Sequence, residues 1–114
     1  MIDLDAKVSF LQQPGSYPHP TERVDAIETH MSWVFLTDAF VYKLKKPVRT
    51  SFLDFSTLAL RKHFCEEELR LNRRLAPHVY LQTVALVWAP AGLSLDGAGH
   101  VVDWLVKMVR LPSD

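Results

Sequence analysis

One glutamate lies in the middle of an apolar stripe in the second half of the chain. The stripe has intervals of four, four, three and four residues, which place its members on one face of a helix: Leu60, Phe64, Glu68, Leu71 and Leu75. We expect this face to pack on the rest of the molecule. An unpaired carboxylate is costly to bury, so Glu68 then needs a cation. Alternatively, the stripe is wide and Glu68 reaches solvent from its margin.

Two lysines that could pair with this glutamate occur in a strand-like segment before the helix. Side chains alternate along residues 40–45, so Val41, Lys43 and Lys45 share one face of the predicted strand. A strand lysine paired with a helix glutamate can hold an ammonium group against nucleotide phosphates. The alternative is that both lysines are solvated and protect the edge of a sheet.

A second group of polar residues on the same helix could bind a metal ion. His63 and Glu67 are four residues apart, and Cys65 lies between them. A zinc site needs three or four ligands, and we find no further ligands for one here. We therefore interpret His63 and Glu67 as an exposed pair, Cys65 as a small buried apolar residue, and the metal-binding residues as none.

The charge balance argues against a nucleic-acid partner. The chain has 13 Lys and Arg against 13 Asp and Glu, so its net charge is zero, whereas a nucleic-acid-binding domain normally has a basic excess. The basic residues of the predicted helix are interleaved with Glu66, Glu67 and Glu68, and pairing between successive turns explains them.

Length and composition fit one globular domain. The 114 residues are 48% hydrophobic and 23% charged, and we find no apolar run of about 18 residues that would indicate a membrane partner. The opening segment MIDLDAKVSF does not resemble a signal peptide. A single cysteine fits a reducing compartment, so we expect a cytoplasmic protein.

The order of predicted elements indicates an α+β fold. Residues 1–22 are expected to form a short helix and a proline-rich loop, appended to a main domain of residues 23–114. Strands are predicted near 24–28, 33–37, 40–45, 79–88 and 100–109, the last two joined by a glycine-rich loop, and a helix capped by Asp54 or Ser56 runs to about Leu75. This order predicts an antiparallel sheet of about five strands with one long helix packed on it.

This arrangement resembles the N-terminal lobe of the protein-kinase-like fold. It resembles the aminoglycoside phosphotransferase branch more closely, and uncharacterised bacterial kinase-like proteins more closely still, over about residues 8–112. The segments that carry the resemblance are IETHMSWVFL (27–36), VYKLKKPV (41–48), FLDFSTL (52–58) and HFCEEELRLNRRLAP (63–77). The last segment is the most specific, because apolar residues and arginine follow the helix glutamate and a leucine precedes the next loop.

The resemblance implies a role for individual residues. Lys43 would bind the α- and β-phosphates of ATP or GTP with magnesium, Glu68 would orient Lys43, and Val41 would cover the base. Lys45 is the second choice, because Lys43 would then take the place of Val41 against the adenine. Residues 29–32 occupy the place of the phosphate-covering loop, where hydroxyl groups of Thr29 and Ser32 could replace glycine.

The sequence departs from the kinase pattern in two ways. It contains no Gly-x-Gly-x-x-Gly motif, and residues 29–32 contain no glycine. Its last residues match the hinge that leads to the C-terminal lobe, which supplies the base aspartate and the metal ligands in this fold. We therefore assign no catalytic residues, and expect a kinase-like transferase lobe that provides half of a nucleotide-binding site and is not competent alone.

Two alternatives remain open: a non-catalytic scaffold or protein-interaction module, and a truncated fragment of a larger phosphotransferase. The expected partner is a C-terminal lobe or a second copy of the chain. Either would cover an exposed apolar surface near Val41 and the last predicted strand, at Trp104, Val106 and Met108.

Overall fold

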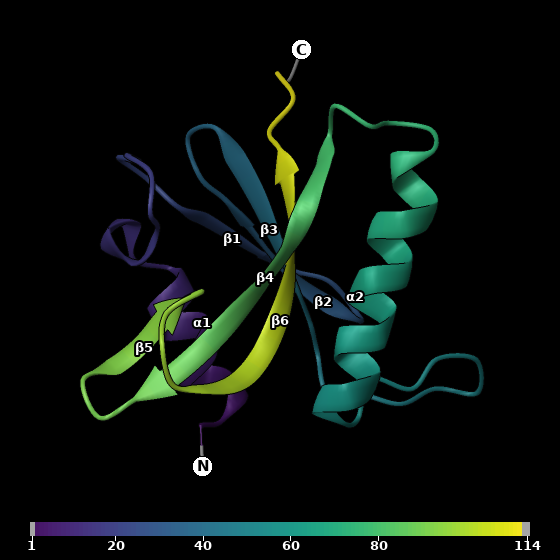
Figure 1. The fold of residues 1–114 in the computed structure, drawn as a ribbon, viewed down its shortest axis with the longest axis horizontal. Helices are drawn as coiled ribbons and strands as arrows, with labels where there is room; N and C mark the ends of the chain where they lie inside the picture. Colours follow the sequence, from purple (N-terminus) through teal and green to yellow (C-terminus); the bar gives the residue numbers. More distant parts are fainter. Residues whose placement is uncertain (1, 113–114) are drawn as a thin grey trace.

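The computed structural model describes residues 2–112, which form one antiparallel sheet and two α-helices (Figure 1). Within these residues the sheet has six strands in the order β1-β2-β3-β6-β4-β5. The elements are α1 (Leu4–Leu11), the 3-10 turn η1 (Pro14–Ser16), β1 (Asp25–Glu28), β2 (Ser32–Leu36), β3 (Phe40–Lys45), α2 (Leu58–Arg73), β4 (Tyr80–Ala89), β5 (Gly92–Leu95) and β6 (His100–Val109). The predicted α+β class and the helix packed on an antiparallel sheet are confirmed.

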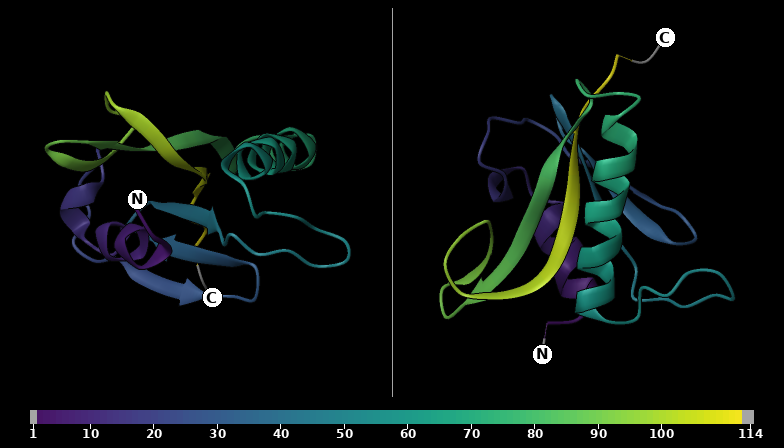
Figure 2. Two further views of the ribbon diagram at one scale, coloured as in Figure 1. Left: turned by 90° about the horizontal axis from the view of Figure 1, so that it is seen from below. Right: turned by 45° about the vertical axis from the view of Figure 1, so that its right-hand side comes forward.

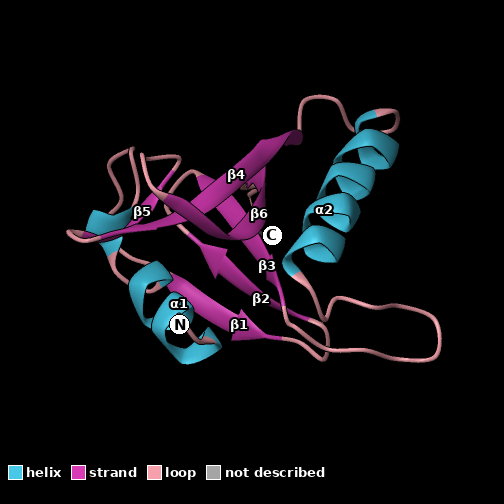
Figure 3. Ribbon diagram, turned by 60° about the horizontal axis from the view of Figure 1, so that its bottom comes forward, coloured by secondary structure: helices cyan, strands magenta, loops and turns pink. Residues whose placement is uncertain are grey.

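The sheet is curled, and the two helices lie at different places on it (Figure 2). Strands β1, β2 and β3 form a meander, and β3 then pairs with β6, with Leu44 opposite Leu105. The chain passes through α2 between β3 and β4, and α2 packs against β4 and β6. Figure 3 shows α1 beside β1 and α2 at the far side of the sheet.

The hydrophobic core lies between the sheet and α1. Its buried members are Val8, Leu11, Tyr17, Phe35, Tyr42, Leu44, Val84, Leu86 and Leu105. Leu11 is fully buried, and Tyr17 after η1 is nearly so. The N-terminal helix therefore belongs to the core, and the predicted appendage of residues 1–22 is wrong as a description of the packing. A helix of eight residues has few apolar positions, so its sequence pattern did not indicate that α1 packs into the core.

Two boundaries differ from the predictions for the long helix. The N-cap of α2 is Thr57, whose hydroxyl accepts a hydrogen bond from the Leu60 amide at 3.2 Å. Asp54 accepts a hydrogen bond from the Ser56 amide instead, so neither of these two residues caps the helix. The helix ends at Arg73 rather than at Leu75.

The structure contains a strand that the sequence prediction missed. β5 (Gly92–Leu95) forms a hairpin with β4, in which Ala89 pairs with Gly92. Gly92 has a φ of +123°, a conformation that favours glycine at this turn. The short segment lacks the β-branched and aromatic residues that indicate a strand, so its sequence predicts a loop between β4 and β6.

The packed face of α2 is also different from the predicted stripe. Leu71 and Leu75 are 51% and 89% exposed, whereas Arg61 and Cys65 are buried. The face toward the sheet therefore follows Arg61, Cys65 and Glu68, at intervals of four and three residues. The prediction placed only apolar residues on the packed face of α2. Arg61 and Glu68 can also lie there, because they pair with Asp103 and Lys45.

The apolar surface expected near the last strand is only partly exposed. Val106 is fully buried, and Trp104 is half-buried under α2, where its carbonyl oxygen lies 3.8 Å from the Cys65 Sγ. Val41 and Met108 pair in register and are half-buried. The large apolar side chains exposed in the described residues are Ile27, Phe52, Leu53, Leu71, Leu75, Trp88, Val101 and Leu111. In residues 2–112 we find no helix that could span a membrane.

Candidate functional site

Glu68 pairs with both candidate lysines. Its Oε2 lies 3.0 Å from the Nζ of Lys43, and its Oε1 lies 2.6 Å from the Nζ of Lys45. Each carboxylate oxygen therefore accepts a hydrogen bond from one lysine. The sequence left open whether Lys43 or Lys45 is the phosphate-binding lysine. Pairing with Glu68 does not decide between them, because both lysines bind its carboxylate.

The alternation of β3 and the position of α2 create this cluster. Residues 43 and 45 of β3 point to the same side of the sheet, and Lys43 lies between Val34 of β2 and Val106 of β6. On the helix, Asn72 donates a hydrogen bond of 2.8 Å to the backbone carbonyl of Glu68. The carboxylate is thus carried by a regular helix beside a strand in the interior of the sheet.

The three charged side chains differ in exposure. The side chain of Lys45 is 7% exposed, that of Glu68 15%, and that of Lys43 31%. The Lys45 Nζ also lies 5.1 Å from the ring centroid of Phe55, which is buried in the loop before α2. Lys45 is therefore an interior cation, and Lys43 is the member of the cluster that solvent or a ligand can reach.

Burial and charge act in opposite directions on Glu68. Burial alone would raise the pKa of its carboxyl group, but the hydrogen bond and charge of Lys45, followed by those of Lys43, hold the pKa below its usual value. Glu68 is thus ionised at neutral pH. Two ammonium groups share one carboxylate, so the cluster has an excess of one positive charge, and the accessible part of it is at Lys43.

The turn between β1 and β2 is closed by its own hydrogen bonds. The Thr29 hydroxyl donates to the Ser32 carbonyl and accepts from the Ser32 amide, both at 3.0 Å, and Ser32 is buried. Lys46 also reaches this turn, where its Nζ donates to the Thr29 carbonyl at 2.8 Å and pairs with Glu28. Sequence analysis gave no signal that Lys46 belongs to this turn.

A second charged cluster, which sequence analysis missed, is buried between the helices. Asp103 of β6 is 1% exposed, and its Oδ2 lies 2.8 Å from the Lys7 Nζ while its Oδ1 lies 3.0 Å from the Arg61 Nε. Arg61 also donates to the Phe55 carbonyl at 2.9 Å. The available signal was an acidic residue within an otherwise apolar strand, where a carboxylate needs partners.

His63, Cys65 and Glu67 of α2, which sequence analysis considered as metal ligands and set aside, differ in their surroundings. In residues 2–112 no three or more His, Cys, Asp or Glu side chains gather where they could hold a metal ion. Glu67 pairs with Arg70 at 2.6 Å, and hydrogen bonds from Arg70 lower the pKa of Glu67. Cys65 is fully buried, as expected, and burial raises the pKa of its thiol to about 12.

Comparisons with known proteins find relatives of part of the chain. No family model and no solved structure matches it. An uncharacterized protein of Mycobacterium bovis and uncharacterized proteins of two Mycobacterium tuberculosis strains are each 45% identical to it over 58 residues. That stretch is 51% of this chain but 12% of each relative. The chain thus matches a small part of much longer proteins.

Proposed function

We propose that this chain forms half of a binding site for ATP or GTP in a kinase-like phosphotransferase. The observation that carries the proposal is the pair between Lys43 of the third strand and Glu68 of the helix that follows it, at 3.0 Å. Protein kinases use a lysine and a glutamate on the corresponding elements to position the phosphates of ATP. The resemblance noted in the sequence segments places the same residue types at the same elements.

The two lysines divide the work in this proposal. Lys43 is partly exposed and keeps N–H groups free for a phosphate, because an ammonium group has three donors and one of them reaches Glu68. Lys45 is interior and holds the other carboxylate oxygen, which fixes the orientation of Glu68. Val41, two residues before Lys43 on the same face, and Met108 beside it provide an apolar contact for the base.

The turn at residues 29–32 lies at the edge of the proposed site. Its lack of glycine limits how closely its amides approach phosphate. The Thr29 hydroxyl is already hydrogen-bonded within the turn, and Ser32 is buried. We therefore propose that these two residues position the turn and do not bind phosphate directly. Lys46 at the same turn donates to the Thr29 carbonyl and pairs with Glu28, and we propose that its remaining N–H group is an additional phosphate ligand.

Phosphoryl transfer needs a base and metal-binding carboxylates that we do not assign to this chain. We propose that a second lobe supplies them together with magnesium, either from the rest of a longer protein or from another chain. The length of the mycobacterial relatives, in which the matched stretch is 12%, leaves room for such a lobe. The free thiol of Cys65 and the need for nucleoside triphosphate make the cytoplasm the proposed location.

One observation favours a different function, that of a non-catalytic interaction module. Leu71 and Leu75 are exposed near the C-terminal end of α2, and an apolar pair of this kind suits contact with a protein partner. In this alternative the cluster at Glu68 only stabilises the fold.

Calorimetric titration with magnesium ATP distinguishes the two functions. We expect saturable heat of binding for the protein, and an affinity roughly tenfold to a hundredfold lower for Lys43→Ala, because a hydrogen-bonded charge is lost. Lys62→Ala is the matched control, since Lys62 is an exposed lysine of α2 outside the site and its loss should leave the affinity unchanged. Absence of heat with the folded wild-type protein would exclude the nucleotide site and favour the interaction module.

A further inference from the structure

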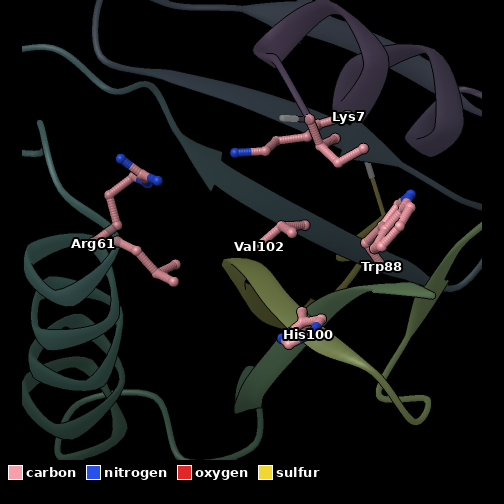
Figure 4. Close-up of a pocket in the computed structure, with 7 residues that line it drawn as sticks. Lys7, Arg61, Trp88, His100 and Val102 are labelled. Atoms are coloured by element: carbon pink, nitrogen blue, oxygen red, sulfur yellow. The ribbon is translucent and has the colours of Figure 1, made fainter.

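A cavity of about 590 Å³ opens between α1, the first turn of α2 and the paired ends of β4 and β6 (Figure 4). Its walls include Leu58, Val102 and the indole of Trp88. The side chains of Lys7 and Arg61 project into it from the two helices, and His100 borders it from β6. The volume lies within the range of small-molecule sites, which combine apolar walls with a few polar groups.

The polar groups of the cavity carry an excess of positive charge. Lys7 and Arg61 are 7% and 6% exposed, and they share the single carboxylate of Asp103. The Arg61 Nε and Nη1 are hydrogen-bonded, whereas its Nη2 has no protein partner within residues 2–112. The Lys7 ammonium likewise keeps donors beyond the one that reaches Asp103. A buried excess of one positive charge favours a bound monoanion.

We propose that this cavity is a binding site for a small aromatic monocarboxylate. The ligand carboxylate lies beside Asp103, where it neutralises the excess charge and accepts hydrogen bonds from the donors of Lys7 and Arg61 that Asp103 does not use. The aromatic body fills the apolar part of the cavity against Trp88, Leu58 and Val102, with the indole available for stacking because it is 39% exposed. Mostly apolar walls fit such a body better than they fit a free phosphate or a nucleotide.

The cavity is separate from the Lys43 cluster. Trp88 alternates with Val84 and Leu86, so it lies on the side of the sheet that faces α1. Lys43 and Lys45 lie on the opposite side, because Tyr42 and Leu44, which alternate with them along β3, face the α1 core. Binding at the cavity therefore does not depend on the nucleotide site, and each proposal can fail without the other.

Titration with 1-naphthaleneacetate, followed by NMR of the tryptophan indole N–H signals, tests the proposal. We expect saturable binding that shifts the Trp88 signal while those of Trp33 and Trp104 stay in place. The neutral analogue 1-naphthaleneacetamide should bind at least about tenfold more weakly, because it lacks the charge that Lys7 and Arg61 recognise. Equal affinity for acid and amide would overturn the proposed role of the two cations.

Two variants locate the binding. Trp88→Ala should lower the affinity for 1-naphthaleneacetate roughly tenfold, because it removes one wall of the cavity. Val101→Ala is the matched control, because Val101 is a neighbouring strand residue that does not line the cavity. The proposal is overturned if the wild-type protein shows no saturable shift, or if the largest shifts lie around Lys43. It is also overturned if Trp88→Ala binds as tightly as the wild type and the Val101→Ala control do.

Discussion

Asp103→Asn is expected to lower the free energy of unfolding by about 3–5 kcal/mol, the usual effect of removing one partner from a buried charge cluster. The carboxylate is 1% exposed and compensates Lys7 and Arg61, which come from the two helices. Asparagine keeps the size of the side chain, so the loss reports the uncompensated charges rather than a cavity. Because a domain of this size has only about 5–15 kcal/mol of stability, the variant should be marginal.

Urea unfolding of the wild type and the variant measures this effect. Asp25→Asn is the control, because Asp25 pairs with Arg23 on the surface and exposed pairs contribute little. A triple variant, Lys7→Met with Arg61→Met and Asp103→Leu, should recover most of the stability, since all three charges are then replaced together. An Asp103→Asn variant as stable as the Asp25→Asn control would show that the cluster does not compensate buried charge.

Glu68→Gln is expected to lower the free energy of unfolding by about 2–4 kcal/mol, somewhat less than the change at Asp103. The substitution leaves the buried ammonium of Lys45 without its carboxylate, while Lys43 can still turn to solvent. Glu67→Gln is the matched control on the neighbouring position. Its partner Arg70 is exposed on the helix surface, so the control should change little.

The same variant changes how stability depends on pH. The pKa of Glu68 is lower in the folded protein than its ordinary value of 4.5, because the two lysines favour the ionised form. Its contribution is therefore complete above the unfolded pKa and is lost as the pH falls through the folded pKa. Urea unfolding between neutral and acid pH should show a smaller loss for Glu68→Gln than for the wild type. Parallel curves would contradict the assigned interaction.

The Lys43 cluster could be predicted from sequence because it depends on local periodicity. A strand repeats every two residues, so Val41, Lys43 and Lys45 had to share a face. The conspicuous carboxylate of Glu68 on the next helix then identified the partner. What the sequence could not show is that both lysines bind Glu68 and that they differ in exposure, because this depends on how α2 and the loop with Phe55 pack.

The Asp103 cluster depends on contacts between distant parts of the chain. Lys7 and Arg61 lie 96 and 42 residues from Asp103, and no pattern within one element relates them. The packed face of α2 was predicted wrongly for the same reason, because it depends on contacts with distant parts of the chain. Leu71 and Leu75 were core residues by type, but both are exposed, and Leu75 lies beyond the end of α2 at Arg73.

The most direct test of the central claim observes the lysine side chains while magnesium ATP is added. NMR of the lysine side-chain Cε–H signals, assigned by single lysine variants, follows Lys43, Lys45, Lys46 and the control Lys62 in one titration. The proposed nucleotide site predicts saturable shifts at Lys43 and Lys46, smaller shifts at the interior Lys45, and none at Lys62. If Lys43 shifts no more than Lys62 while the protein remains folded, the Lys43–Glu68 pair is not a phosphate-binding device.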